Sequence, residues 1–236
     1  ATPDADERTL YAALRRALFA PTNSTFVHWQ EMETLDPPVK ALLNADSLPI
    51  PVGPSGQTFN PASHTHYIGV TTGDAPSQAE VIGLITHVVE HFGSGNAYVY
   101  INRAQEATVR GFADFKPYLD ARLVNQTAGI VATGTLNVNN IYDRSIGLLD
   151  SAEVWVKPWI PANYMFAFID GQARPLVLRQ PIPESARNLR PVADDENHPL
   201  RAREWEHRFG VGVWNRVNGA VLDITTGSGT YAAPSV

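Results

Sequence analysis

The chain has 236 residues, 44% hydrophobic content and a formal net charge of -6, so it can bury the core of one large or two small domains. The negative charge and the absence of a dense basic cluster exclude a protein that grips nucleic acid over its whole surface. The sequence has no cysteine, which excludes disulfides and thiolate metal sites, and no apolar run approaches the ~20 residues that span a bilayer. We therefore expect a soluble, non-secreted protein without a membrane partner.

The first predicted element is a helix over residues 2–19. Thr2 is the expected N-cap, Pro3 suits the first helical position, and Pro21 ends the helix. Its apolar side chains recur at helical spacing and form one stripe: Leu10, Tyr11, Leu14, Leu18 and Phe19. Such a stripe needs a partner surface, which another subunit can supply.

A strand is expected at residues 26–29, and a proline-rich segment follows over residues 31–61. A segment of this length with weak periodicity is functional or flexible when it occurs in a compact domain. Its prolines favour an extended arm: Pro37, Pro38, Pro49, Pro51, Pro54 and Pro61. The chain then returns as a strand over residues 64–70.

The clearest local signals lie in residues 77–101. Ser77 and Glu80 have the spacing of a capping box at the start of a helix over residues 77–92. The face expected to be buried comprises Val81, Ile82, Ile85, Val88, Val89 and Phe92. Glycines at 93 and 95 end the helix, and residues 98–101 are predicted to form a strand.

The rest of the chain is predicted to be mostly strands and turns. We expect a short helix within residues 111–123, a turn-rich stretch over residues 128–149, and a loop over residues 187–198. Strands are predicted at 153–157, 163–169 and 175–179, the last two joined as a hairpin at Asp170-Gly171, and a long hairpin is predicted from 203–214 and 220–224 around Asn218-Gly219.

One stretch matches a catalytic motif. His87, Glu90 and His91 have the H-x-x-E-H spacing of zinc peptidases, in which two histidines bind zinc and a carboxylate activates water. On the helical wheel, however, both histidines fall opposite the apolar stripe, so we interpret them as part of a solvated face. His64 and His66 alternate on one strand face and could join a metal site, but we interpret them as polar surface.

No other pattern predicts catalysis. The sequence has no G-x-S-x-G elbow and no phosphate-binding G-K-[ST] loop. Four tryptophans lie in strand-like segments, where packing in the core or at a subunit interface is the expected role: Trp155, Trp159, Trp205 and Trp214. We therefore expect no enzyme activity, no cofactor, no catalytic residue and no metal, with His87, Glu90 and His91 as the alternative zinc site.

The order of these elements resembles the major capsid proteins of tailed bacteriophages with the Hong Kong 97 type fold. The resemblance rests on the helix at residues 77–92, on residues 154–180 (VWVKPWIPANYMFAFIDGQARPLVLRQ) and on residues 205–225 (WEHRFGVGVWNRVNGAVLDIT). It implies an α+β fold with an N-terminal arm, an extended loop, a spine helix with a β-sheet, and a central axial domain.

The resemblance also implies a division of the chain into four parts. These are an N-terminal arm (1–25), an extended loop with flanking strands (26–75), a peripheral domain with the spine helix (76–102 and 181–236), and an axial domain (103–180). The side chains expected at subunit interfaces are Leu10, Leu14, Leu18, Lys40, Trp155 and Trp159. Some relatives crosslink a loop lysine to a neighbour's asparagine, and Lys40 and Asn218 are candidates, although no local motif requires it.

The implied function is self-assembly through pentamers and hexamers into an icosahedral shell that encloses a phage genome without specific DNA binding. The implied partners are other copies of the chain, a scaffolding protein, a portal and a prohead protease. The implied location is the virion capsid, with assembly in the host cytoplasm. Three alternatives remain: an encapsulin-type nanocompartment of the same fold, a zinc hydrolase using the HVVEH stretch, and a small α+β binding module.

Overall fold

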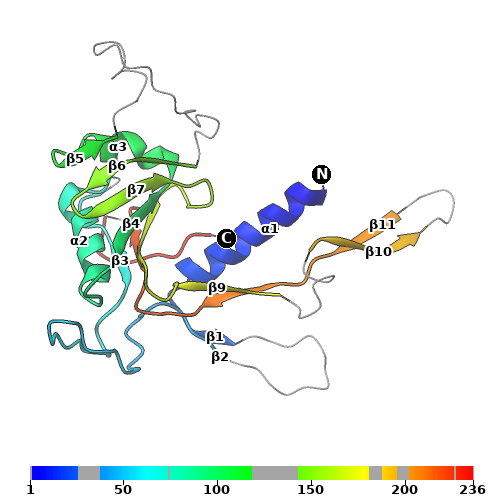
Figure 1. Ribbon diagram of the computed structural model, residues 1–236, viewed down its shortest axis with the longest axis horizontal. Coiled ribbons are helices and arrows are strands. Elements are labelled where there is room, and N and C mark those ends of the chain that lie inside the picture. The colour runs from blue at the N-terminus through cyan, green and yellow to red at the C-terminus, as the bar shows by residue number, and fades with distance from the viewer. Residues whose placement is uncertain are drawn as a thin grey trace, which may run out of the picture.

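The computed structural model describes residues 2–25, 38–73, 75–118, 143–180, 188–195, 202–225 and 227–235. A seven-stranded mixed sheet forms the body, with helices against it and two-stranded ribbons projecting from it (Figure 1). The helices are α1 (Thr2–Phe19), α2 (Gln78–Val89) and α3 (Glu106–Arg110), with a 3-10 turn at Arg103–Gln105. The strands are β1 (Ser24–Thr25), β2 (Pro38–Val39), β3 (Tyr67–Gly69), β4 (Asn96–Ile101), β5 (Phe115–Pro117), β6 (Arg144–Leu149), β7 (Ala152–Val156), β8 (Tyr164–Asp170), β9 (Leu176–Arg179), β10 (Arg190–Asp195), β11 (Ala202–Glu206), β12 (Gly210–Val213) and β13 (Ala220–Asp223).

The large sheet has the strand order β3-β13-β8-β4-β7-β6-β5. Two of its pairings are parallel, β3 with β13 and β4 with β7, and the other four are antiparallel. The expected α+β class is therefore confirmed. The sheet takes strands from both sides of residues 102 and 180, so the domain boundaries expected there do not coincide with breaks in the sheet.

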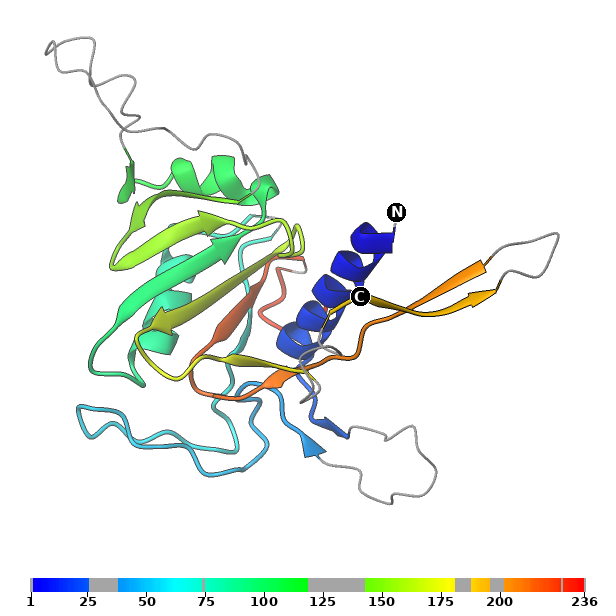
Figure 2. The same cartoon turned by 45° about the vertical axis from the view of Figure 1, so that its right-hand side comes forward.

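Helix α2 covers one face of the sheet (Figure 2). Ser77 caps it as predicted: its side chain accepts from the Glu80 amide, while the Glu80 carboxylate accepts from the Ser77 amide. The predicted face is only partly right, because Leu84 is fully buried and Val89 remains 37% exposed. The side chains that α2 buries against the sheet are Val81, Leu84, Ile85 and Val88.

The Glu80 carboxylate joins the helix start to the segment that follows β3. It accepts hydrogen bonds from the amides of Thr71 (2.7 Å) and Ser77 (2.8 Å) and from the Thr72 hydroxyl (2.7 Å). Burial raises the pKa of Glu80, but these hydrogen bonds outweigh burial and lower it to about 2. The ionised carboxylate is thus the form that stabilises the fold.

Replacing Glu80 with Gln is expected to lower the free energy of unfolding by about 1–2 kcal/mol at neutral pH, since it weakens the cap. Because the folded-state pKa lies below the ordinary value of 4.5, the stabilisation is complete above that pH and is lost as the pH falls toward 2. Urea unfolding at several pH values should therefore show a shallower acid dependence in the variant. Asp4→Asn, at an exposed position in the first turn of α1, is the control.

A second core lies on the opposite face of the sheet, where the C-terminal end of α1 packs. Leu18 and Phe19 are fully buried, and the Phe19 ring meets Tyr164 edge-on at 5.5 Å. The Tyr67 hydroxyl donates to the carbonyl of Ala20 at 2.8 Å. The C-terminal end of α1 therefore packs in the core of its own chain, so the expectation that Leu18 lies at a subunit interface is wrong.

Residues 41–46 belong to the body of the protein and not to a free arm. Leu42 is fully buried in the second core. Arg216 holds this segment by donating to the carbonyls of Ala41 (2.7 Å) and Leu42 (3.1 Å) and to the carboxylate of Asp46 (2.9 Å). Within the expected arm, residues 31–37 lie outside the described residues, and residues 47–63 form a loop below the sheet (Figure 1).

The prediction for the region after β4 is wrong in the described residues. Helix α3 precedes the expected 111–123 helix, and β5 occupies part of that range. Strand β6 lies in the stretch expected to be turn-rich. It bulges between Ser145 and Gly147, where a Cβ on Gly147 would collide with the backbone of β5. The remaining parts of both predictions, at residues 119–142, lie outside the described residues.

Both predicted hairpins are also wrong. The chain does turn at Asp170-Gly171, but β9 then pairs with β12 instead of β8. Strand β13 pairs with β8 and β3 instead of β12. The loop expected over residues 187–198 contains β10, which pairs with β11. The strand expected at residues 26–29 lies outside the described residues.

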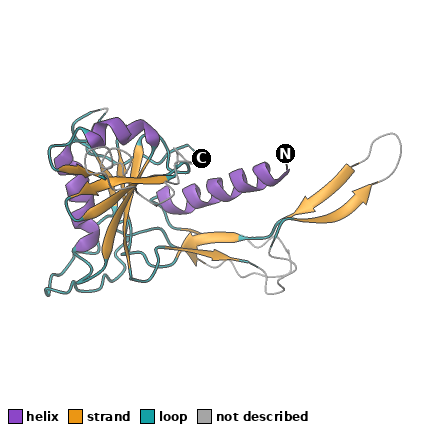
Figure 3. Cartoon of the chain, turned by 45° about the horizontal axis from the view of Figure 1, so that its top comes forward, coloured by secondary structure: helices purple, strands orange, loops and turns teal. Residues whose placement is uncertain are grey.

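The strands that leave the sheet build a long projection. The antiparallel pairs β9–β12 and β10–β11 follow one another away from the body (Figure 3). Helix α1 runs beside the first pair, and its Asp6 carboxylate lies 2.7 Å from Nδ1 of His207. We call β9, β10 and residues 202–214, which contain β11 and β12, together the ribbon. Among the described residues, no helix is long and apolar enough to cross a membrane.

Candidate functional site

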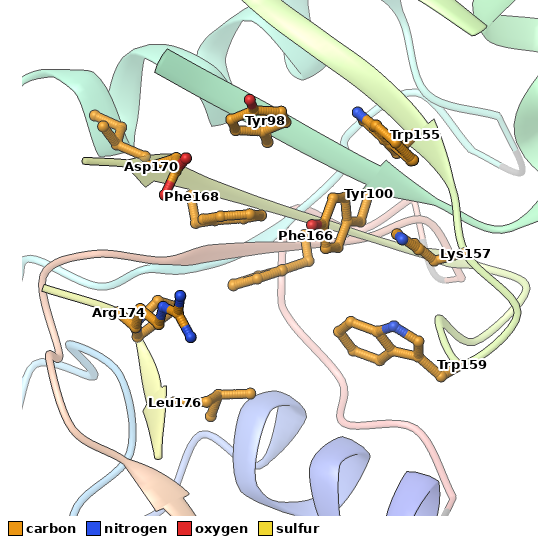
Figure 4. Close-up of a pocket in the computed structure, with 12 residues that line it drawn as sticks. Tyr98, Tyr100, Trp155, Lys157, Trp159, Phe166, Phe168, Asp170, Arg174 and Leu176 are labelled. Carbon is orange, nitrogen blue, oxygen red and sulfur yellow. The ribbon is translucent and has the colours of Figure 1, made fainter. Parts of the chain in front are cut away.

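The face of the sheet away from α2 carries an aromatic groove (Figure 4). Strands β4 and β8 alternate, so that Tyr98 and Tyr100 lie beside Phe166 and Phe168 on one face. Phe168 stacks on Tyr98 at 5.5 Å and on Phe166 at 5.5 Å between ring centroids. The groove encloses about 450 Å³ and is closed on its far side by Leu176 of β9.

The edge of the groove at β7 carries a positive charge. Nζ of Lys157 lies 4.7 Å from the ring centroid of Trp155 and 5.2 Å from that of Tyr100, and it donates to Asp143 at 2.5 Å. Burial, with the nearby Asp143 carboxylate, raises the pKa of Tyr100 to about 12. The buried Nε1 of Trp155 has no hydrogen-bond partner among the described residues. Because aromatic side chains form its floor, the groove is suited to binding an apolar or aromatic segment.

The ribbon exposes large apolar side chains that the described part of the chain does not cover. Trp214 is 63% exposed, and the others that are more than 40% exposed are Leu178, Val192 and Trp205. A second cavity, of about 700 Å³, lies between β2 and the ribbon and is lined by Lys40 and Trp214. Exposed apolar patches of this kind mark interaction surfaces in soluble proteins.

The residues predicted to lie at interfaces are spread over these surfaces. Trp155 and Trp159 line the aromatic groove, and Lys40 lines the cavity between β2 and the ribbon. Leu10 and Leu14 are half-buried along α1. Asn218 is unsuited to crosslinking because its side chain is fully buried and donates to the carbonyls of Ile169 and Ala173, both at 2.9 Å.

The aromatic floor of the groove was missed by sequence reasoning. The signal was present, because Tyr98 and Tyr100, like Phe166 and Phe168, are two residues apart and therefore share one face of a strand. It could not be used without knowing that β4 and β8 are neighbours.

The structure brings four histidines together at the C-terminal end of α2. The Nε2 atoms of His64, His66 and His91 lie 3.0–3.2 Å from one another. Nε2 of His87 lies 2.8 Å from the carbonyl of Thr65, and Nδ1 of the same ring lies 3.6 Å from the Glu90 carboxylate. The motif residues thus lie beside two histidines that were interpreted from the sequence as polar surface.

The interpretation of these histidines as solvated surface is wrong. His66 is fully buried, and His64, His87 and His91 are partly buried. Burial, with the nearby His87, lowers the pKa of His64 to about 4. Burial, with His64 and His87, lowers the pKa of His91 to about 4, and burial lowers the pKa of His66 well below its ordinary value. All three rings are neutral at pH 7.

The fold matches a known bacteriophage structure. A solved chain from Mycobacterium phage Patience is similar over 99% of this chain, with a TM-score of 0.74 and 20% sequence identity. This chain spans 65% of that chain's length. A chain of the holo-SrpI encapsulin complex from Synechococcus elongatus PCC 7942 is also similar, with a TM-score of 0.42 and 12% sequence identity. The match covers 78% of this chain and 62% of the encapsulin chain. No protein-family model and no curated protein matches the sequence.

These findings define the fold class. The chain has the fold of a bacteriophage protein, which confirms at the level of the fold the resemblance inferred from the order of its elements. The particular structure that shows this is the Mycobacterium phage Patience chain, to which nearly the whole of this chain aligns.

Proposed function

We propose that this chain is a structural capsid protein that assembles with copies of itself into a closed shell of the Hong Kong 97 type. The observation that carries the proposal is the ribbon, which projects from the body (Figure 1). The ribbon exposes Trp205 and Trp214. A monomer gains nothing from an extended two-stranded projection with exposed tryptophans, whereas a shell subunit can bury it against its neighbour. The fold shared with a phage protein supports the same function.

The interfaces would be built from apolar surfaces with charged edges. The ribbon contributes aromatic anchors, and the aromatic groove provides a concave surface that such anchors fit. Buried aromatic side chains dominate the energetics of many protein interfaces. Many modest contacts per subunit, repeated by symmetry, are sufficient to close a shell.

The geometry favours a change in one part of the expected organisation. The resemblance implies a spine helix at residues 77–92, but α2 has 12 residues and covers a face of the sheet. Helix α1 has 18 residues, and Asp6 ties it to the ribbon at His207. We therefore assign the spine to α1, and the sheet with α2 to the axial part of the subunit.

Negative-stain electron microscopy and sedimentation velocity of the purified protein test the proposal. Closed particles, or rings of five or six subunits, are the expected result. A homogeneous monomer at every concentration would contradict shell formation and favour a small binding module. Particles that carry defined cargo proteins and no DNA would favour a cellular nanocompartment over a viral capsid.

A Trp214→Glu variant is expected to lose assembly while keeping its fold. Trp214 is 63% exposed, so the monomer loses little, but a carboxylate on the ribbon cannot be buried in an apolar interface without a large cost. The association constant of each ribbon contact should fall at least about tenfold, which corresponds to about 1.4 kcal/mol, so sedimentation velocity should show mostly unassembled protein.

The matched control is Trp214→Phe, which keeps an aromatic anchor at the same position and is expected to assemble. Circular dichroism of both variants checks that the fold is intact. Normal particles from a folded Trp214→Glu protein would show that the ribbon is not an interface.

A further inference from the structure

The three Nε2 atoms of His64, His66 and His91 converge on one point from two elements. His64 and His66 lie just before β3, and His91 follows the C-terminal end of α2. Each pair of these nitrogens is separated by 3.0–3.2 Å. Ligands about 2.0–2.1 Å from a tetrahedral metal ion are about 3.3 Å apart, so the spacing matches that of a coordination sphere.

Hydrogen bonds among the rings do not account for this arrangement. Nδ1 of His66 lies 2.6 Å from the carbonyl oxygen of Gly219 and therefore carries the proton of the neutral ring. The Nε2 atom of His66 then carries no proton and presents a lone pair. If His64 and His91 both donated to it, their own two N–H groups would face each other at 3.0 Å. A cation satisfies all three lone pairs at once.

The surroundings have the features of a metal site. The donation from His66 to Gly219 fixes the ring and its tautomer, as outer-shell partners of metal-bound histidines do. The Glu90 carboxylate lies beside the cluster, 4.0 Å from Nε2 of His64, and Gln57 donates to its other oxygen at 3.3 Å. Phe59 packs on the His91 ring at 4.1 Å and shields the cluster.

We propose that His64, His66 and His91 bind one Zn²⁺ ion through their Nε2 atoms, and that this ion fastens the segment before β3 to the end of α2. Imidazole nitrogens suit zinc, and three of them leave the fourth position of a tetrahedral ion to a small ligand such as water. The inference does not depend on shell assembly.

This site differs from the peptidase motif suggested by the sequence. Nε2 of His87 donates to the carbonyl of Thr65 at 2.8 Å, so that ring supports the backbone beside the cluster instead of joining the three converging nitrogens. His64 and His66 take the places that the motif would give to His87 and to a further protein ligand. The proposed metal position therefore lies among different histidines from those of the motif.

Metal analysis of the purified protein tests the proposal. After exposure to equimolar zinc and gel filtration, the protein should retain one zinc ion per chain, and removal by a chelator should lower the melting temperature. Cobalt(II) in place of zinc should give the intense visible bands of a tetrahedral site. Retention of no zinc, or a weak octahedral cobalt spectrum, would overturn the proposal.

Variants identify the ligands. His91→Ala and His64→Ala should each weaken zinc binding more than about 100-fold. Thr86→Ala, at an exposed position on the same helix, should bind zinc as the wild type does. Unchanged zinc retention in the folded His91→Ala protein would overturn the assignment. If that variant does not fold, the cobalt spectrum of the wild type decides.

Discussion

Val88→Asp is expected to abolish folding, because the new carboxylate would be enclosed between α2 and the sheet. Val88 is 1% exposed and belongs to the main hydrophobic core. An unpaired carboxylate at such a position has no donor to replace water, so the loss exceeds about 4 kcal/mol. The total stability of an ordinary domain is about 5–15 kcal/mol, so this loss removes most of it at the lower end of that range.

The neighbouring residue provides the control. Val89 lies on the same helix but is 37% exposed, and Val89→Asp should keep the circular dichroism spectrum and melting transition of the wild type to within about 1 kcal/mol. The two variants have the same composition and charge, so any difference between them reports burial. A folded Val88→Asp protein with a cooperative melting transition would contradict the packing of α2 on the sheet.

Arg216→Ala is expected to have the second largest effect, a loss of about 3 kcal/mol in the free energy of unfolding. The guanidinium joins the turn before β13 to residues 41–46 through hydrogen bonds to the carbonyls of Ala41 and Leu42 and to the Asp46 carboxylate. Its removal leaves Asp46 without its cationic partner and releases the segment that places Leu42 in the second core. Arg216→Lys should restore little, because an ammonium group cannot reproduce the planar set of donors.

Arg208→Ala tests whether any arginine would behave in the same way. Arg208 forms an ion pair with Glu206 on the ribbon, and its side chain is 57% exposed. Exposed pairs contribute at most about 1 kcal/mol, so chemical denaturation should scarcely distinguish this variant from the wild type. Equal losses for the two variants would show that residues 41–46 are not held by Arg216.

The parts of the fold that could be predicted are those fixed by local chemistry. Helix α1 has the range expected from its spacing and its prolines, and α2 begins at the capping box of Ser77 and Glu80. Strands β4, β7 and β8 were predicted because their β-branched and aromatic residues favour a pleated, buried surface.

The parts that could not be predicted depend on contacts between distant residues. Strand β6 contains the small residues Ser145 and Gly147 and forms because β5 and β7 flank it. The hairpin expected around Asn218-Gly219 fails because β13 gains more by entering the large sheet than by pairing with its neighbour in sequence. His66 was judged exposed because nothing in its own segment reveals that α2 will cover it.

The position of β13 has a consequence for synthesis of the protein. This strand is the last in sequence among the described residues, yet it lies between β3 and β8 and provides a pairing partner for both. While the ribosome is still making the preceding residues, β3 has no neighbour in the sheet and β8 has an open edge. Pairings of such long sequence separation form slowly, and unpaired edges aggregate. The body is therefore expected to complete its folding only after translation has passed residue 224, and until then the nascent chain is open to chaperones.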